Sequence, residues 1–263
     1  MSTATLPRRA WVQQIMGLPV SVHVRGDDPD SAEVRAGVEA VFADLRHADA
    51  VFSPYRDDSD LNHWARGELE AEAADPAFGE VLTLCERARE RTDGWFDPRE
   101  LPDPRTGTPR FDPSGLVKGW AVQRAAGRLR QLRGRSWCLN AGGDVLVHAE
   151  DDHPAWRVGI EHPDDRAGLL HVLERRDGAV ATSGTAHRGR HIIDPTTGRP
   201  ASAVRAVTVT GPQLLWADVY ATAAVARGPG CLPWLNTLEG HAALLVSASG
   251  LVQVTEPGPA PSA

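Results

Sequence analysis

The sequence predicts an α+β fold built on a largely antiparallel sheet. Helix and strand patterns do not alternate strictly along the chain, and several strand patterns follow one another directly, which favours antiparallel pairing over a doubly wound fold. At 263 residues, with 41% hydrophobic and 24% charged residues, the chain can bury a substantial core. We therefore expect a single domain over residues 11–255 and flexible termini at 1–10 and 256–263.

The first part of the chain is predicted to hold two strands and two helices. Apolar residues alternate within 11–24 and indicate two strands around a Gly-Pro break. A helix is predicted over 30–48, where Asp30 and Glu33 resemble a capping box. A polar, extended segment follows, and a second helix is predicted from 75 to 94. The buried stripe of the first helix is expected to consist of Val34, Val38, Val41, Phe42 and Leu45.

The rest of the chain alternates less regularly. Residues 99–111 are rich in Pro and charge and are predicted to form a surface loop, and a helix follows at about 116–132. Helical patterning returns at 214–227, with a short helix near 232–238. Strands are predicted at 137–140, 144–148, 156–160, 169–173, 178–182, 206–210, 241–247 and 251–255.

Charge and cysteine content exclude several classes of function. The formal charge is −7, and no basic stripe is present, which argues against a nucleic-acid partner. No apolar run approaches the roughly 20 residues that a membrane-spanning helix needs. The three cysteines are widely spaced and odd in number, so neither a disulfide framework nor a zinc site is expected. With no apolar segment after the N-terminal arginines, we expect a cytoplasmic protein.

The stretch 191–200 combines a short strand with a rigid turn. The carboxylate of Asp194 can accept hydrogen bonds from the amides of its own turn, Pro195 fixes φ, and Gly198 allows a positive φ. The strand therefore carries His191 into a loop whose amides can face an anion. His191 could act as an acid or base, although a lone strand histidine is more often a hydrogen-bonded structural residue.

Asp218 and Thr222 are four residues apart in a predicted helix, so their side chains lie on one face. A carboxylate and a hydroxyl suit a hard cation such as Mg²⁺. The alternative is a local hydrogen bond or a solvated Asp, and we expect Asp218 at the helix surface. Alanines keep this helix slim, which allows another backbone to approach (Ala217, Ala221, Ala223 and Ala224).

Two glycine-containing turns could approach a ligand. Residues 112–119 lead into a helix, where free amides could hold a phosphate, although a simple N-cap explains the pattern too. Lys118 within this stretch is the only lysine of the chain. Its compact ammonium could serve a purpose, or the scarcity of lysine could reflect a coding bias. The turn at 140–144 allows close backbone approach, but a hairpin turn is the simpler explanation.

Together and in this order, eight motifs resemble the FAD:protein FMN transferase family, the ApbE-like flavin transferases. The resemblance runs from about Met16 to the last strands, and its most specific parts are the 191–200 loop and the Ala-Asp-x-x-x-Thr segment. It implies an ApbE-like domain that transfers FMN from FAD to a Thr or Ser of an acceptor protein, with release of AMP and dependence on Mg²⁺. The motifs are residues 52–55, 94–98, 112–121, 140–144, 156–160, 181–184, 191–200 and 217–222.

The resemblance also assigns site residues. It implies that Asp218, Thr222 and the carbonyl of Gly115 ligate Mg²⁺, and that His191 lies nearest the phosphoryl chemistry. Residues that match positions lining the FAD site are Met16, Tyr55, Trp95, Phe96, Asp97, Asp112, Lys118 and Ile193.

Two alternatives share these features. An Mg²⁺-dependent FAD pyrophosphatase, in which water replaces the acceptor hydroxyl, would use the same metal and diphosphate site. A non-catalytic FAD-binding protein would need no metal ligands, so the combination of Asp218, Thr222 and His191 argues against it.

Overall fold

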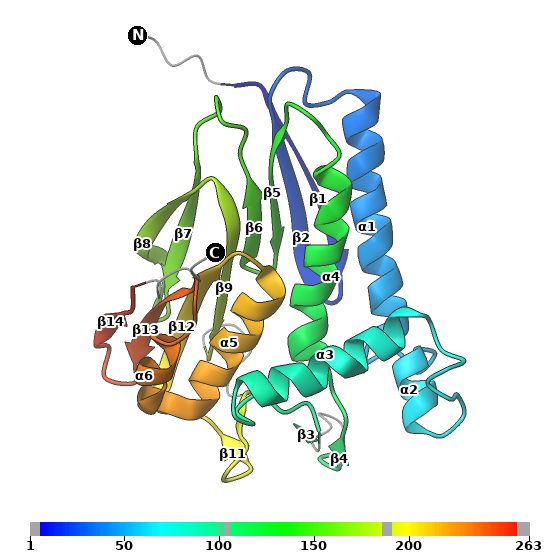
Figure 1. The fold of residues 1–263 in the computed structure, drawn as a ribbon, viewed down its shortest axis with the longest axis vertical. Coiled ribbons are helices and arrows are strands. Elements are labelled where there is room, and N and C mark those ends of the chain that lie inside the picture. The colour runs from blue at the N-terminus through cyan, green and yellow to red at the C-terminus, as the bar shows by residue number, and fades with distance from the viewer. Residues whose placement is uncertain (1–5, 100, 103–105, 186–190, 257–263) are drawn as a thin grey trace.

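Eight antiparallel strands form the sheet on which the rest of the chain is arranged (Figure 1). The computed structural model describes residues 6–99, 101–102, 106–185 and 191–256. Every neighbouring pair in this sheet is antiparallel, which confirms the predicted α+β class. In spatial order the strands are β1 (Arg8–Ile15), β2 (Leu18–Arg25), β5 (Ser136–Ala141), β6 (Asp144–His148), β9 (Asp177–Gly184), β12 (Val204–Gly211), β13 (Ala242–Ser247) and β14 (Val252–Val254).

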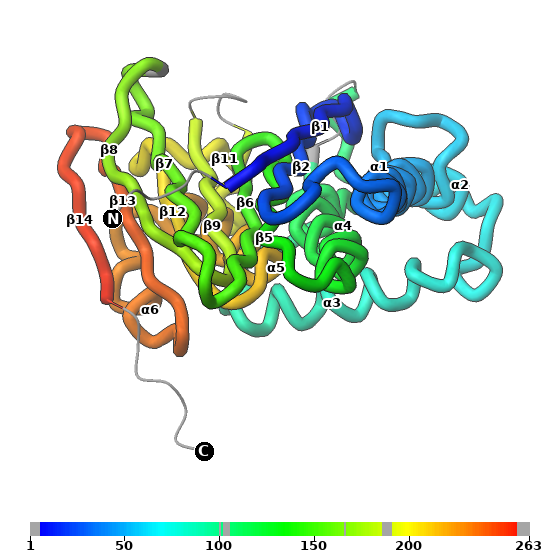
Figure 2. The backbone as a smooth tube through the Cα atoms, turned by 90° about the horizontal axis from the view of Figure 1, so that it is seen from above, coloured from blue at the N-terminus to red at the C-terminus, as the bar shows by residue number. Residues whose placement is uncertain are grey.

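Helices cover one face of this sheet. Figures 1 and 2 show α1 (Ala32–Phe52), α4 (Ser114–Leu129) and α5 (Leu214–Arg227) against that face, with α3 (Ala77–Arg91) crossing on their outer side. The predicted stripe of α1 is buried, because its apolar residues recur at the helical period. The five residues are Val34, Val38, Val41, Phe42 and Leu45, each at most 1% exposed.

Strand periodicity decides which side chains face the helices. Within β6, Leu146 belongs to the main core, whereas Val145 and Val147 belong to a smaller cluster with Val158 and Val180. Successive strand residues point to opposite faces, so the main core lies on the helical side. The smaller cluster lies under the hairpin of β7 (Trp156–His162) and β8 (Asp165–Arg175), which covers the other face.

The N-terminal strand begins earlier than predicted. β1 starts at Arg8, which pairs with Arg25 of β2, so three residues of the segment 1–10 belong to the sheet rather than to a flexible end. Pairing with β2 places these three residues in the sheet. The sequence did not predict this, because they show no alternation of apolar and polar residues. Residues 1–5 and 257–263 lie outside the described residues.

Short elements interrupt the segments predicted as loops. Helix α2 (Asp60–Ala65) forms in the polar segment after α1, where the sequence predicts no helix. The Ser59 hydroxyl caps it by accepting a 3.2 Å hydrogen bond from Asn62 N. α3 ends at Arg91, three residues before its predicted end. The remaining short elements are β3 (Leu101–Pro102), β4 (Pro109–Arg110), β10 (Ile193–Asp194), β11 (Arg199–Pro200), a 3₁₀ turn (Gly228–Cys231) and α6 (Leu232–Leu235).

Within the described ranges, no helix is both long enough and apolar enough to cross a membrane.

Candidate functional site

Three elements bring two carboxylates to one ammonium group beneath the helices. Lys118 of α4 forms an ion pair with Asp144 of β6, and its Nζ lies 3.4 Å from Asp218 Oδ1 of α5. Asp144 and Asp218 are each 1% exposed, so both charges are buried. Because a buried carboxylate is costly without a partner, the ammonium compensates both. We call Lys118, Asp144 and Asp218 the central ion cluster.

Asp144 reaches this cluster because of its place in β6. It shares its face with Leu146, two residues on, and that face carries the main core beneath α4 and α5. Its second oxygen, Oδ1, accepts a 2.9 Å hydrogen bond from the amide of Thr182 in β9. The carboxylate is thus fixed by a neighbouring strand on one side and by the ammonium on the other.

The close approach of α4 to α5 depends on Gly119. A Cβ at this position would lie 3.0 Å from Leu215 Cα, 3.1 Å from Leu214 O and 3.2 Å from Asp218 Cβ. These neighbours include main-chain atoms, which cannot rotate away as a side chain can. Gly119 therefore permits the helix contact that places Asp218 beside the adjacent Lys118.

Thr222 lies one turn beyond Asp218 on α5. Its Oγ1 is 3.0 Å from Ser183 Oγ of β9, which lies on the helical face of the sheet. The structure therefore brings Asp218, Thr222 and Ser183 to one side of α5. Asp218 is not at the helix surface as expected, because the sheet covers that side of α5; its burial is the correction that the structure makes.

Gly115 lies in the first turn of α4, one turn before Gly119. A Cβ here would lie 3.2 Å from an edge atom of the Phe96 ring, so the absence of a side chain lets the ring contact this turn. Phe96 is 5% exposed, and its amide donates a 3.0 Å hydrogen bond to the Thr92 hydroxyl. The residue is a core aromatic that supports the start of α4.

Arginine side chains neutralise the other two predicted carboxylates. Asp112 accepts from Arg110 at 3.0 Å and from the amide of Ser114 at 3.0 Å, which fixes the entry to α4. Asp97 lies 2.5 Å from Arg99 and 3.6 Å from Arg89. Burial works against ionisation of Asp97, but the hydrogen bonds and charge of Arg99 outweigh it and lower the pKa of the carboxyl.

The 191–200 turn has the predicted geometry. Asp194 Oδ1 accepts from the amide and the hydroxyl of Thr196 at 2.8 and 2.7 Å, and Gly198 has φ of +64°. The hydrogen bond from the Thr196 hydroxyl, with that from its amide, lowers the pKa of Asp194. Ile193 is half-buried and His191 is exposed, and β10 contacts α5. This turn therefore adjoins the helix that carries Asp218.

Met16, Tyr55 and Trp95 come from three segments outside the elements that form the central ion cluster. Met16 occupies the tight turn between β1 and β2 with φ of +54°. Tyr55 is 69% exposed. Trp95 contacts Arg227, with the guanidinium carbon 5.8 Å from a ring centroid, and Arg227 follows Asp218 by nine residues, about half a revolution around the helix axis. Trp95 thus meets the opposite side of α5.

The Met16 turn nevertheless meets another motif. A Cβ on Gly142 would lie 3.0 Å from Leu18 Cδ2, and the amide of Gly142 donates to Pro19 O at 3.0 Å. The segment after Met16 therefore lies against the turn that leads into Asp144. The positive φ of Gly142, +61°, fits the tight hairpin that places Asp144 at the start of its strand.

Asp144 and Ser183 are site residues to which the sequence analysis assigned no role of their own. Both fall inside motifs 140–144 and 181–184, where an acidic or hydroxyl residue at a strand end was the available signal. A hollow of about 650 Å³ lies near the entry to α4, and its described lining includes none of the predicted FAD-site residues. It is lined by Trp64, Leu82, Glu86, Arg99, Pro109, Arg110 and Phe111.

The donor set fits a hard cation. Asp218 supplies a buried carboxylate, Thr222 a hydroxyl oxygen, and the position between Asp144 and Asp218 already holds a positive charge in the form of the Lys118 ammonium. No group of three or more His, Cys, Asp or Glu residues gathers within the described part of the chain. A Mg²⁺ ion here would therefore complete its shell with water or phosphate oxygens.

Comparison with known proteins identifies relatives. Residues 16–102 and 103–245 match the model of the ApbE family. A FAD:protein FMN transferase of Vibrio cholerae is 35% identical over 128 residues, 44% of this chain and 38% of the relative. That of Treponema pallidum is 27% identical over 285 residues, 81% of this chain and 77% of the relative. The match to the Escherichia coli K12 protein, at 29% identity, spans 53% of this chain and 43% of that relative.

Solved structures share the fold. The ApbE protein of Thermotoga maritima superposes with a TM-score of 0.80 at 21% identity, over 95% of this chain and 97% of that one. The flavin transferase ApbE from Vibrio cholerae also gives 0.80, at 22% identity, over 96% and 98% of the two chains. With the family model matching most of the sequence, the chain belongs to the ApbE family.

Proposed function

We propose that this protein transfers FMN from FAD to a Thr or Ser hydroxyl of an acceptor protein in an Mg²⁺-dependent reaction that releases AMP. The observation that carries the proposal is the pair of buried carboxylates, Asp144 and Asp218, around one cation position beside Thr222. Such an arrangement suits the charge neutralisation that transfer of a phosphoryl-linked group requires. Relatives named FAD:protein FMN transferase support this choice of substrate.

The proposed reaction breaks the phosphoanhydride bond of the FAD diphosphate and forms a phosphoester bond to the acceptor. The acceptor oxygen attacks the phosphorus on the FMN side of the diphosphate, and a new P–O bond forms. The bond from that phosphorus to the bridging oxygen breaks, and AMP leaves with the bridging oxygen. The hydroxyl proton passes to a base, for which we propose His191, exposed at the start of the 191–200 turn, or a nearby carboxylate.

We propose that Asp218, Thr222 and the carbonyl of Gly115 hold Mg²⁺. When bound, the ion would neutralise charge on the diphosphate oxygens. Lys118, within reach of both buried carboxylates, would add positive charge on the same side. Gly115 lies one turn before Gly119 on α4, and Thr222 lies one turn beyond Asp218 on α5. The close approach of the two helices at Gly119 supports the assignment of these groups to one site.

The flavin nucleotide would lie along the segments that adjoin α4 and the 191–200 turn. Phe96 supports the first turn of α4, and Asp112 fixes its entry. We retain the remaining residues as proposed FAD contacts: Met16, Tyr55, Trp95, Asp97, Lys118 and Ile193. A cytoplasmic location is part of the proposal, supported by the free thiols of Cys85, Cys138 and Cys231.

The test is to follow AMP, free FMN and protein-bound FMN after incubation with FAD and Mg²⁺, with and without an acceptor protein. The proposal expects AMP in equal amount to bound FMN, and little free FMN without acceptor. Equal rates of FMN and AMP release in both mixtures would favour a pyrophosphatase and contradict transfer. Tight FAD binding without any product, across several acceptors, would indicate a flavin-binding protein.

A further inference from the structure

The main chain on both sides of Tyr55 is held by hydrogen bonds, although the ring itself is exposed. Tyr55 comes three residues after the end of α1, and its side chain is 69% exposed. Pro54 before it is buried, and the amide of Tyr55 lies 3.4 Å from the Ser53 hydroxyl. An exposed aromatic on a fixed loop suits a contact with a ligand, because little backbone freedom remains to be lost on binding.

One side chain donates to the carbonyl of the residue before Tyr55 and to the carbonyl of the residue after it. The amide nitrogen Nδ2 of Asn62, on α2, lies 3.3 Å from Pro54 O and 2.7 Å from Arg56 O. It also lies 3.5 Å from Ser53 O. The carbonyls of Pro54 and Arg56 are therefore tied to the same donor group, which fixes the main chain from which the Tyr55 side chain projects.

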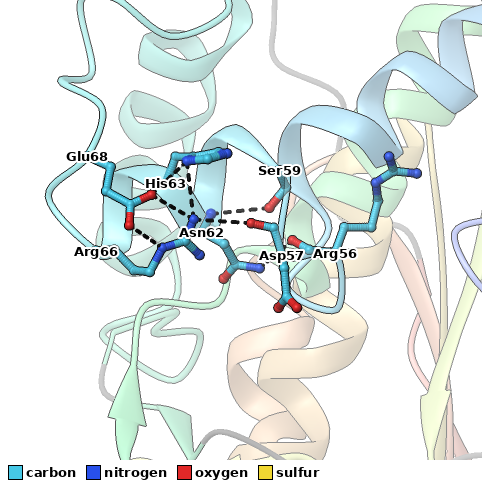
Figure 3. Close-up of polar contacts among 7 residues, drawn as sticks. All are labelled: Arg56, Asp57, Ser59, Asn62, His63, Arg66 and Glu68. Atoms are coloured by element: carbon cyan, nitrogen blue, oxygen red, sulfur yellow. Dashed lines mark hydrogen bonds and ion pairs between the residues drawn. The ribbon is translucent and has the colours of Figure 1, made fainter.

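Helix α2 is itself anchored to the loop at its other end. Arg66 donates to Asp57 O at 3.2 Å and pairs with Glu68 at 2.8 Å, and His63 lies 2.8 Å from the same carboxylate. Figure 3 shows these side chains gathered around α2, with Asn62 among them. Helix α2 is therefore fixed to the Tyr55 loop at two places, through Arg66 and through Asn62.

A second set of hydrogen bonds links this loop to the start of α4. Arg110 donates to Pro54 O at 3.2 Å, and its other terminal nitrogen pairs with Asp112 at 3.0 Å. Asp112 accepts from the amide of Ser114, at the start of the helix that carries Lys118. The Tyr55 loop is therefore fixed relative to α4.

We infer that Asn62 is a positioning residue for FAD: its side-chain amide fixes the main chain on both sides of Tyr55, so that the exposed ring is preorganised to stack on a planar ring of the dinucleotide. The inference rests on the proposed function, which supplies FAD as the ligand. Asn62 touches neither substrate nor metal in this role, and it acts through Tyr55 alone.

The experiment is a double-mutant cycle on FAD binding, measured by flavin fluorescence in EDTA so that no turnover occurs. Tyr55→Ala should weaken FAD binding about fivefold, as expected for loss of an aromatic stacking contact. Asn62→Leu and Asn62→Asp, neither of which can donate to the two carbonyls, should each weaken it by a similar factor. The double variant Tyr55→Ala/Asn62→Leu should also lose only about fivefold, because the two changes remove one interaction.

Ser59→Ala is the matched control, because it removes the hydroxyl that accepts from the main-chain amide of Asn62 and leaves the side-chain amide of Asn62 and its bonds to the loop in place. It should lower thermal stability yet change FAD affinity by less than about twofold. Thermal unfolding of Asn62→Asp, which keeps the shape of the side chain, shows whether the fold survives. With FAD and acceptor, the Asn62 variants should raise KM for FAD and leave kcat within about twofold, a split that general loosening would not give.

Three results separate the possible failures. Undiminished FAD affinity in Asn62→Asp, with affinity lost in Tyr55→Ala, would overturn the inference and leave the proposed function intact. A loss of about 25-fold in the double variant, the product of two independent fivefold effects, would do the same. A wild-type protein that binds no FAD would overturn the inference together with the proposed function.

Discussion

Replacing Lys118 by Met removes the ammonium that lies between Asp144 and Asp218. Both carboxylate side chains are 2% exposed, whereas Lys118 is 22% exposed. Removal of one partner from a buried ion pair costs about 3–5 kcal/mol, and because water reaches part of the lysine we take about 3 kcal/mol. Against a total stability of about 5–15 kcal/mol, the variant should still fold.

Urea unfolding in EDTA measures this loss. A decrease of about 3 kcal/mol lowers the unfolding midpoint by roughly 1 M. Arg124→Met is the matched control, since Arg124 lies on the same helix and pairs with Glu80 at 2.9 Å, with both side chains largely exposed. Its loss should stay below about 1 kcal/mol.

Addition of Mg²⁺ gives a second reading of the same variant. If the position between the carboxylates accepts a divalent cation, Mg²⁺ at about 100 times its Kd should return about 2.7 kcal/mol to Lys118→Met. Equal midpoints for Lys118→Met and Arg124→Met in EDTA would refute the claim that the ammonium balances Asp144 and Asp218.

Three further outcomes are expected. Asp218→Asn should reduce Mg²⁺-dependent FMN transfer at least about 100-fold, while circular dichroism shows a folded protein; full activity would place the cation elsewhere. Gly119→Ala should destabilise the protein by about 1–3 kcal/mol, measured by chemical denaturation, and should weaken Mg²⁺ binding. The control is Gly127→Ala on the same helix, where no atom lies within 4 Å of the added Cβ. That substitution should be neutral or slightly stabilising. Burial raises the pKa of Cys85 to about 12, which disfavours the thiolate, so at pH 8 this buried thiol should resist alkylation until denaturant unfolds the chain. Equal labelling rates of Cys85 in native and unfolded protein would contradict this burial.

Local patterns predicted the elements whose physics is local. The α1 stripe is buried as its spacing predicts, and the turn at Asp194 forms because Asp, Thr and Gly satisfy its amides and its positive φ within five residues. Helix α2 was not predicted, because six residues with one buried apolar side chain, Leu61, carry no helical period. Its evidence in the sequence is the cap Ser59, which gains meaning only once Asn62 bonds to the neighbouring loop.

Long-range contacts account for what the sequence could not show. Asp144 lies 26 residues after Lys118, and only the order β5, β6, β9 beneath α4 and α5 brings it to the ammonium. The burial of Asp218 depends in the same way on the sheet that covers its side of α5. Residue type and helical spacing predicted that Asp218 and Thr222 share one face of a helix. The approach of Asp144 to the same site depends on the tertiary fold.

Mass spectrometry of a Thr- or Ser-bearing acceptor, after incubation with the protein, FAD and Mg²⁺, tests the proposed activity most directly. We expect the acceptor to gain the mass of one FMN less one water, with no adduct in EDTA and almost none with Asp218→Asn. An adduct formed equally well in EDTA, or equally well by Asp218→Asn, would contradict the assignment of the cation site. Quantitative conversion of FAD to free FMN and AMP with an unmodified acceptor would contradict transfer itself.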